Sequence, residues 1–290
     1  MSGVPPEHDR GAHPGPAPGE IFAPGVAPPP GLEGPAPHFA FRDDQLLVEG
    51  DGAAARIPCA ADFAELGIPF TARHYLGHVG GRHCFAVDLT ADAAAPEGMT
   101  IGGLRGFFGA LGEEQFRLAG RAFQVLNWDR THRYCGRCGT ATEPSPVERA
   151  RTCPACGLAA FPRLSPAIIV LVSRGRELLL ARSPRFPKGR YSIIAGFVEP
   201  GESLEEAVVR GVREEVAIEV SDIRYFGSQS WPFPHSLMLG FTARYAKGQI
   251  QIAEEEIADA GWYAPDRLPD LPDRASISRR IIDAFLASQV

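Results

Sequence analysis

Two neighbouring glutamates, Glu214 and Glu215, stand in an acidic segment whose spacing could bind a metal ion. Arg210 precedes Glu214 by four residues, so on a helix the guanidinium and that carboxylate share one polar flank. Oxygen ligands clustered in this way suit a hard divalent cation such as magnesium. The alternative for an isolated pair of glutamates is a solvated helix face held by ion pairs one turn apart.

Carboxylates outside this helix could complete the site. Glu199 and Glu202 precede the helix on a turn and could add contacts through water. Glu256, in the run Glu254–Glu256, is the best distant carboxylate to close the site. A divalent cation held by such a set would neutralise a pyrophosphate and position an attacking water. The acidic residues therefore indicate cleavage of a phosphoanhydride.

Four of the six cysteines form two C-x2-C pairs, the spacing of a structural zinc site: Cys135, Cys138, Cys153 and Cys156. Gly139 and Gly157 follow the pairs and permit the tight turns that such a site needs. Because four thiolates leave no open coordination position, this zinc would fold a small module and take no part in chemistry. The alternative is a set of thiols that no longer binds metal. Cys59 and Cys84 are left over, and we expect both to be buried thiols.

Arginines make the region around these cysteines locally basic: Arg130, Arg133, Arg137, Arg149, Arg151 and Arg163. Such a region could attract a nucleotide or an RNA phosphate. A solvated basic face is the default expectation.

Regular elements must position the acidic residues. An apolar strand is predicted over 191–198, Pro200 and Gly201 break it, and Ser203 with Glu206 forms a capping box that starts a helix. Further strands are expected over 167–172, 177–181, 222–229, 236–245 and 260–263, with a short helix at 254–256 and a closing amphipathic helix over 275–288. Upstream, strands are expected over 45–48 and 83–87, and helices over 104–111 and 114–126.

The acidic helix and its turn resemble the Nudix box, G-x5-E-x7-R-E-U-x-E-E-x-G-U, where U is aliphatic. The matching residues are Gly196, Glu202, Arg210, Val212, Glu214, Glu215 and Ile218. Gly211 stands where the family has a metal-binding Glu, so one ligand is missing. Ala217 stands where the family has Gly, which costs about 1 kcal/mol if a left-handed cap is kept.

A closer resemblance comes from the order of three motifs: the four-cysteine module, the Nudix box and the segment SQSWPFPHS at 228–236. This combination is similar to the NADH pyrophosphatase (NudC-type) family, with Ser230 in place of a family proline. The resemblance implies hydrolysis of NADH or NAD to nicotinamide mononucleotide and AMP, dependence on magnesium or manganese, a homodimer, and in bacterial members removal of NAD caps from RNA.

The same resemblance implies roles for individual residues. Glu214, Glu215 and Glu256 match the metal-binding and catalytic carboxylates, and Arg210 belongs to the catalytic set. The implied substrate-binding residues are Phe197, which would stack on the nicotinamide, and Gln229, Trp231, Ser236, Met238 and, from the side of the zinc module, Phe161. For Phe197 and Trp231 the alternative is a packing role in the sheet.

We expect an α/β (α+β) protein in four parts. Residues 1–37 are rich in proline and glycine and are predicted to be a disordered tail. An N-terminal α+β domain follows over 38–130, with a structural or dimer-forming role. A zinc ribbon covers 131–163, and 164–290 is expected to form a Nudix α/β/α sandwich with a mixed sheet.

Composition limits the possible partners. The 290-residue chain has a net charge of -6, which argues against general binding of nucleic acid or anionic membranes and leaves small phosphorylated substrates compatible. No apolar run is long enough to span a bilayer and no signal peptide is evident, so we expect a cytoplasmic location. Two other functions stay open: a nucleotide- or RNA-binding protein without catalysis, because of Gly211, and a Nudix hydrolase of another nucleoside diphosphate derivative such as ADP-ribose.

Overall fold

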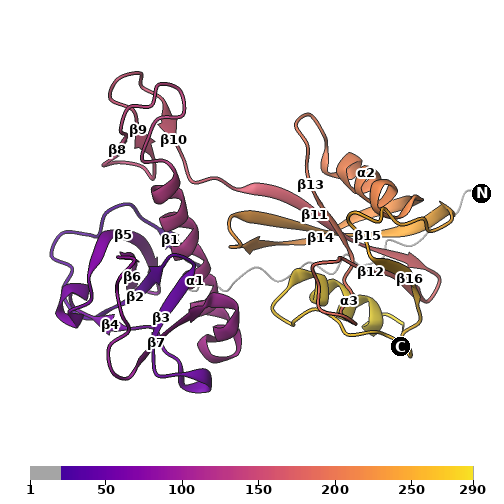
Figure 1. Ribbon diagram of the computed structural model, residues 1–290, viewed down its shortest axis with the longest axis horizontal. Helices are drawn as coiled ribbons and strands as arrows, with labels where there is room; N and C mark the ends of the chain where they lie inside the picture. The colour runs from indigo at the N-terminus through magenta and orange to yellow at the C-terminus, as the bar shows by residue number, and fades with distance from the viewer. Residues whose placement is uncertain (1–20, 290) are drawn as a thin grey trace, which may run out of the picture.

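The protein consists of an N-terminal domain, a small ribbon above it and a second α/β domain (Figure 1). A computed structural model describes residues 21–289. The part of the predicted tail that covers residues 1–20 lies outside the described residues, as does residue 290.

A twisted sheet with one long helix forms the N-terminal domain. The strands follow the order β1-β5-β6-β2-β3-β7, with β4 paired to β2. Their bounds are β1 (Ala23–Pro24), β2 (Ala36–Arg42), β3 (Gln45–Glu49), β4 (Cys59–Ala60), β5 (Phe70–Val79), β6 (Arg82–Leu89) and β7 (Met99–Gly103). Helix α1 (Phe108–Thr131) packs its buried face on this sheet and closes the main core of the domain.

Two expectations for this part of the chain were wrong, those for residues 21–37 and for Cys59. Residues 21–37 are placed, because Ala23 and Pro24 pair with β5, and Ala36 and Pro37 begin β2. The two helical stretches expected over 104–111 and 114–126 are present: a 3-10 turn at Leu104–Phe107 runs into the first part of α1, and Gly112, whose φ of +70° and ψ of +168° are not helical, separates this part from the second, which continues to Thr131. Cys84 is buried as expected, whereas Cys59 is exposed.

The ribbon is a three-stranded unit mounted on the end of α1. Its strands are β8 (Glu143–Pro144), β9 (Arg151–Thr152) and β10 (Ala159–Ala160), paired in the order β10-β9-β8. The Trp128 indole of α1 donates to the Ala160 carbonyl at 3.1 Å, and the Arg149 guanidinium donates to the carbonyls of Gly25 and Tyr75. These bonds join the ribbon to the N-terminal domain.

The C-terminal domain is the expected α/β/α sandwich with a mixed sheet. Its strands run in the order β14-β15-β11-β12-β16, with β13 paired to β11, and the contact between β11 and β15 is parallel. The bounds are β11 (Ser165–Arg174), β12 (Glu177–Arg182), β13 (Ile194–Phe197), β14 (Ile218–Trp231), β15 (Ser236–Gly248), β16 (Asp259–Tyr263), α2 (Leu204–Val216) and α3 (Ile277–Ala287). Helix α2 packs on one face of the sheet and α3 on the other, each with its own apolar core (Figure 1).

The expected helix at Glu254–Glu256 is a turn. A run of three residues is too short to form a helix without a cap and a buried face. Within residues 21–289, no helix is both long and apolar enough to cross a membrane.

Candidate active site and zinc centre

Local sequence places the acidic residues through helix α2. The Ser203 hydroxyl accepts a hydrogen bond from the Glu206 backbone, and the Glu206 carboxylate accepts one from the Ser203 backbone, so the capping box is present. The helix ends at Ala217 in the left-handed region, with φ at +57°. The geometry that the family satisfies with glycine is therefore kept, with a methyl group in its place.

Arg210 joins the turn before α2 to the helix itself. Its guanidinium donates twice to Glu202, at 2.5 and 2.7 Å, and once each to Glu214 and to the Phe197 carbonyl, at 2.9 Å. The hydrogen bonds from Arg210 lower the pKa of Glu202 to about 2, helped by the Glu199 backbone. Because its donors are occupied in this way, Arg210 holds the turn in place.

Glu215 points inward from α2 and is only 9% exposed. Burial, followed by repulsion from Glu256 and Glu214, raises the pKa of this carboxyl to about 8. Glu256 reaches the same place because its loop is pinned to the end of α2: the backbone of Gln251 donates to Val216 and that of Ala253 donates to Glu215, both at 3.1 Å.

These carboxylates fit a hard divalent cation. A buried carboxylate beside two others is unfavourable unless a positive charge compensates it. Oxygen ligands of this kind are those that magnesium and manganese take. Glu214, in contrast, is 59% exposed in its side chain and ion-paired to Arg210 at 2.9 Å.

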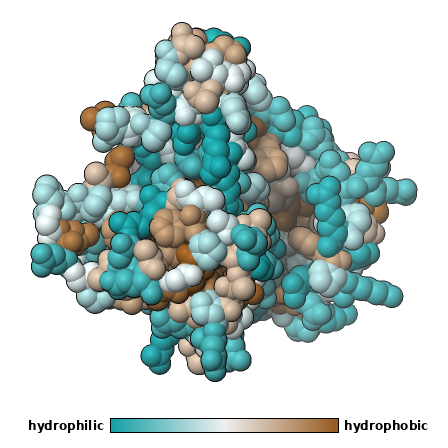
Figure 2. All heavy atoms as spheres, turned by 60° about the vertical axis from the view of Figure 1, so that its left-hand side comes forward, coloured by the Kyte–Doolittle hydropathy of each residue, from teal (hydrophilic) through white to brown (hydrophobic). Residues whose placement is uncertain are grey.

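A cleft of about 1470 Å³ lies in front of these groups. The surface is hollowed between the N-terminal domain and the α/β domain, with apolar atoms in the hollow (Figure 2). Among the predicted site residues, those lining the cleft are Phe197, Arg210, Glu214, Glu215, Gln229, Trp231, Met238 and Glu256. One cleft thus brings together residues from α2, β13, β14, β15 and the loop before β16.

Two predicted substrate-binding residues do not line this cleft. Ser236 is buried, at 6% exposed, where β15 begins beside β11. Phe161 is 54% exposed in the link that follows the ribbon. Their assignment to the substrate stays a prediction.

Gln229 lines the cleft, but both ends of its amide group are hydrogen-bonded within the protein. Its nitrogen donates to the Ala275 carbonyl at 2.7 Å, and its oxygen accepts from the Ile277 backbone at 2.6 Å. The side chain therefore fixes the start of α3 beside the cleft.

The N-terminal domain contributes to the cleft, although sequence reasoning gave it only a structural or dimer-forming role. Arg105, Phe108 and Phe116 line it. The Arg105 guanidinium lies 4.1 Å from the ring centre of Phe233 and 5.3 Å from that of Trp231. No local spacing signals a contact between segments so far apart in the sequence.

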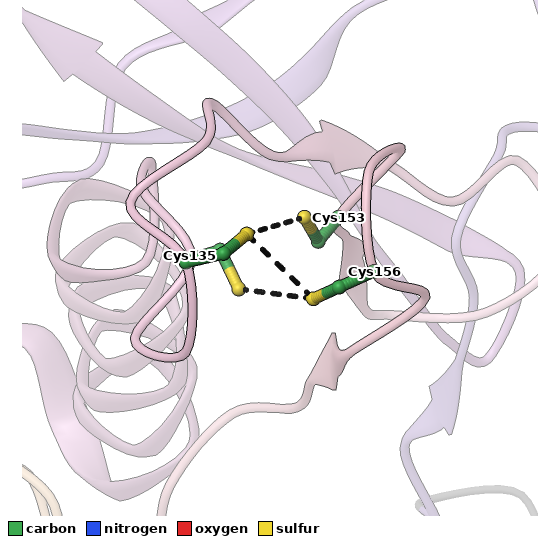
Figure 3. A group of neighbouring side chains, drawn as sticks. Cys135, Cys153 and Cys156 are labelled. Carbon is green, nitrogen blue, oxygen red and sulfur yellow. Dashed lines mark hydrogen bonds between the residues drawn. The ribbon is translucent and has the colours of Figure 1, made fainter.

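The four cysteines meet as the sequence predicted. Figure 3 shows Cys135, Cys153 and Cys156 pointing toward one another. In each loop the backbone of the following glycine, Gly139 or Gly157, donates to the carbonyl of the first cysteine, at 2.8 and 3.0 Å. Both glycines have positive φ, near +75° and +71°.

Sulfur spacing shows that the cysteines fit zinc. The Sγ atoms lie 3.6 Å apart for Cys135 and Cys156, 3.5 Å for Cys138 and Cys153, and 3.7 Å for Cys138 and Cys156. A tetrahedron with zinc–sulfur bonds of about 2.3 Å has edges of about 3.8 Å. This is the one group of possible metal ligands drawn together so tightly within residues 21–289. The module is a structural zinc site.

Three of the six arginines around the zinc module differ from the expected solvated face, whereas Arg133, Arg137 and Arg163 are exposed. Arg151 donates to Asp129 at 2.5 Å and Arg130 donates to Asp88 at 2.5 Å, while Arg149 is bound to backbone carbonyls. These side chains join the ribbon, α1 and the sheet of the N-terminal domain.

Family models match three consecutive segments of the chain. Residues 35–128 match the NADH pyrophosphatase-like rudimentary NUDIX domain, residues 130–161 the NADH pyrophosphatase zinc ribbon domain and residues 162–285 the NUDIX domain. A solved NUDIX hydrolase from Nitrosomonas europaea is 19% identical, covers 54% of this chain and 92% of its own, and has a TM-score of 0.47.

Two curated bacterial proteins are similar to this chain over most of its length. The NAD-capped RNA hydrolase NudC of Pseudomonas aeruginosa is 51% identical over 220 residues, which are 76% of this chain and 79% of that protein. The protein of the same name from Pseudomonas fluorescens is 46% identical over 253 residues, 83% of this chain and 91% of that protein. This chain therefore belongs to the NudC-type NADH pyrophosphatase family of Nudix hydrolases.

Proposed function

We propose that this protein hydrolyses the pyrophosphate bond of NADH or NAD to nicotinamide mononucleotide and AMP, and removes NAD caps from RNA. The observation that carries this function is the cleft that joins the carboxylates of α2 to Phe197 and the SQSWPFPHS segment. The curated relatives named above are NAD-capped RNA hydrolases, which supports the same substrate for this chain.

Different residues of the cleft would bind the metal ion, accept the proton and hold the nicotinamide. Glu214, Glu215 and Glu256 would hold a magnesium or manganese ion, which when bound screens the pyrophosphate charge and activates water. As water adds to one phosphorus, the bridging P–O bond breaks and the water proton must pass to a base, a role that a carboxylate of this set would fill. Phe197, 59% exposed at the end of β13, offers a ring on which the nicotinamide can stack.

Product analysis tests the function. The purified protein is incubated with NADH and magnesium or manganese, and the products are separated by chromatography. We expect AMP and reduced nicotinamide mononucleotide in equal amounts. NADH that binds without release of AMP, even at high protein concentration, would instead indicate a nucleotide-binding protein without catalysis. Faster release of AMP from ADP-ribose than from NADH would favour the other Nudix substrate.

Exchanging Glu215 for glutamine tests the carboxylate assignment. Glu215→Gln removes the buried carboxylate of the set while keeping shape and volume, so turnover should fall by at least about a hundredfold. Glu219→Gln is the matched control, because Glu219 is an exposed glutamate that pairs with Lys247 outside the cleft. Wild-type turnover in Glu215→Gln would remove this residue from the site.

A catalytically inactive protein is the second candidate, since Gly211 removes one carboxylate of the family's set. Arg210, Glu214, Glu215 and Glu256 all line the cleft, which favours the enzyme.

The quaternary structure and location form a further part of the proposal. We expect a homodimer, as the family resemblance implies, and light scattering of the eluted protein would show twice the mass of 31.2 kDa. We also expect a cytoplasmic location, which the four zinc-binding thiols support, because thiols stay reduced there.

A further inference from the structure

The loop that joins β12 to β13 has an ordered shape. Within residues 183–190, the backbones of Arg185 and Phe186 donate to Ser183 at 3.3 and 3.0 Å, and the backbone of Arg190 donates to the Pro187 carbonyl at 3.1 Å. The next residue is tied to the Asp270 carbonyl at 2.8 Å. A loop held in this way presents its side chains at defined positions.

Positive charge and one aromatic ring project from this loop. Arg185, Phe186 and Arg190 line the cleft, and Phe186 is 38% exposed. Lys188 is exposed on the same loop, and Arg274 lines the cleft from the segment before α3. Large apolar side chains that remain exposed at the edge of a cleft are typical of binding sites.

These cations have no anionic partner among residues 21–289. In the part of the chain that the structure describes, the guanidinium groups of Arg185, Arg190 and Arg274 make no hydrogen bond or ion pair. The acidic side chains on this side are Asp270, beside Gly189, and Asp273, which lines the cleft. By contrast, the remaining cleft arginines are engaged, Arg210 with two carboxylates and Arg105 with two aromatic rings.

The chemistry of this loop differs from that of the carboxylate set. The pyrophosphate of a dinucleotide belongs near Glu214, Glu215 and Glu256, which would hold the divalent cation. Free arginines beside an exposed aromatic ring are the combination that binds single-stranded nucleic acid, through phosphate contacts and base stacking. A chain with net charge -6 needs such a local basic element to retain a polyanion.

We propose that the loop 183–190, with Arg274, binds the RNA body of an NAD-capped RNA, with Arg185 and Arg190 on its first phosphates and Phe186 under a base. This assignment rests on the proposed function and adds to it the residues that distinguish capped RNA from the free dinucleotide. It places the RNA at the same cleft as the bond to be cut. The RNA then leaves the cleft past the end of β12.

Comparing two substrates tests the assignment. Arg185→Gln/Arg190→Gln and Phe186→Ala are assayed with NADH and with NAD-capped RNA of about ten nucleotides. We expect the KM for capped RNA to rise roughly tenfold in each variant, while kcat/KM for NADH stays within about twofold of wild type. Arg176→Gln is the matched control, because Arg176 lies in the turn at the opposite end of β12, outside the cleft.

Salt dependence separates the two kinds of contact. For capped RNA, the slope of log(kcat/KM) against log salt should fall by about 0.7 for each arginine removed. The slope should be unchanged in Phe186→Ala, and Phe186→Tyr should restore the KM because it restores the stacking ring. Thermal unfolding of the same samples shows whether a variant is less stable. Binding of a fluorescent 5′-phosphorylated RNA then measures the RNA contact independently of turnover.

Three results would overturn the assignment. One is an unchanged KM and an unchanged RNA affinity for capped substrate in both variants. Another is an equal loss for NADH and capped RNA, which would place the loop at the dinucleotide itself. The third is an equal effect in Arg176→Gln. Absence of hydrolysis of either substrate by the wild-type protein is a separate result that removes the proposed function, and RNA binding by the loop is still measured directly.

Discussion

Position 211 decides how many carboxylates face the cleft. Gly211 lies one turn before Glu215 on α2 and lines the cleft. A Cβ placed there would meet only the Ile168 side chain, at 3.7 Å, which is ordinary van der Waals contact. A Cβ at position 211 therefore has room on this backbone, so the backbone itself does not require glycine here.

Gly211→Glu should tighten binding of manganese and raise turnover, because it restores an oxygen ligand to a site that already holds Glu215 and Glu256. Manganese binding followed by electron paramagnetic resonance and kcat for NADH are the two measurements. Gly211→Ala is the control, because it adds the helix stability gained on replacing glycine, about 1 kcal/mol, without adding a carboxylate. Equal rates in wild type and Gly211→Glu would show that position 211 lies outside the metal site.

At the scale of elements, the end of α2 holds a residue in an unfavourable conformation. Ala217 adopts φ of +57°, and its backbone still donates to the Arg213 carbonyl at 2.9 Å. The Cβ of Ala217 disfavours this left-handed conformation. The chain adopts it nevertheless, because the turn from α2 into β14 requires it whichever residue stands there.

Ala217→Gly should stabilise the protein by about 0.5–1 kcal/mol, since glycine reaches the left-handed region without a steric penalty. Urea unfolding gives the measurement through its midpoint. Ala284→Gly, at an exposed position inside α3, is the opposite control and should cost about 1 kcal/mol. Lower stability in Ala217→Gly would contradict the explanation.

Helix α1 holds the ribbon and the N-terminal sheet through Asp129. Burial opposes ionisation of this carboxyl, but the hydrogen bonds and charges of His74 and Arg151 outweigh it and lower its pKa to about 2. A carboxyl with a lowered pKa in the folded state stabilises the protein above its unfolded pKa of about 3.8, and this contribution is lost as the pH falls toward 2.

Asp129→Asn should therefore destabilise the protein by about 2 kcal/mol at neutral pH, and the difference should shrink as the pH falls from about 5 toward 2. Urea unfolding at several pH values in this range measures it. Glu114→Gln breaks the exposed pair with Arg82 and should cost less than about 1 kcal/mol. A difference for Asp129→Asn that stays the same across this range would mean that another group is responsible.

At the scale of the whole molecule, α1 also supports the SQSWPFPHS segment. The Ser230 hydroxyl donates to Gln124 at 3.1 Å, Arg105 stacks on Trp231 and Phe233, and Gly120 leaves space for Pro232. A Cβ at Gly120 would come within 2.8 Å of a Pro232 side-chain carbon. One wall of the cleft thus depends on close packing between two domains.

Gly120→Ala should raise the KM for NADH several-fold with little change in kcat, because it moves the Trp231 segment and leaves the carboxylates of α2 in place. Steady-state kinetics separate the two constants. Gly106→Ala is the control, since a Cβ at that position meets nothing. Unaltered kinetics in Gly120→Ala would show that the packing against α1 does not shape the substrate site.

The sequence by itself determined the features that depend on short spacing. The zinc knuckles, the capping box of α2, and the order of Arg210, Glu214 and Glu215 all arise within a few residues of each other. Their turns and helix periods are local, so residue types and distances along the chain were enough to predict them and, with the SQSWPFPHS segment, the family. Local pattern was insufficient at residues 21–37, where pairing with β5 and β4 overrides a composition typical of disorder.

Only the tertiary structure decided which distant groups share the cleft. Arg105 reaches Trp231 and the loop 183–190 faces the carboxylates through packing between domains and strands, for which a single sequence carries no spacing signal. The same holds for Gln229, whose amide is occupied by the start of α3, and for Arg149 and Arg151, which tie the ribbon to its neighbours where a solvated face was expected. The type of a residue limits which groups its side chain can bind. The fold decides which of those groups lies within contact distance.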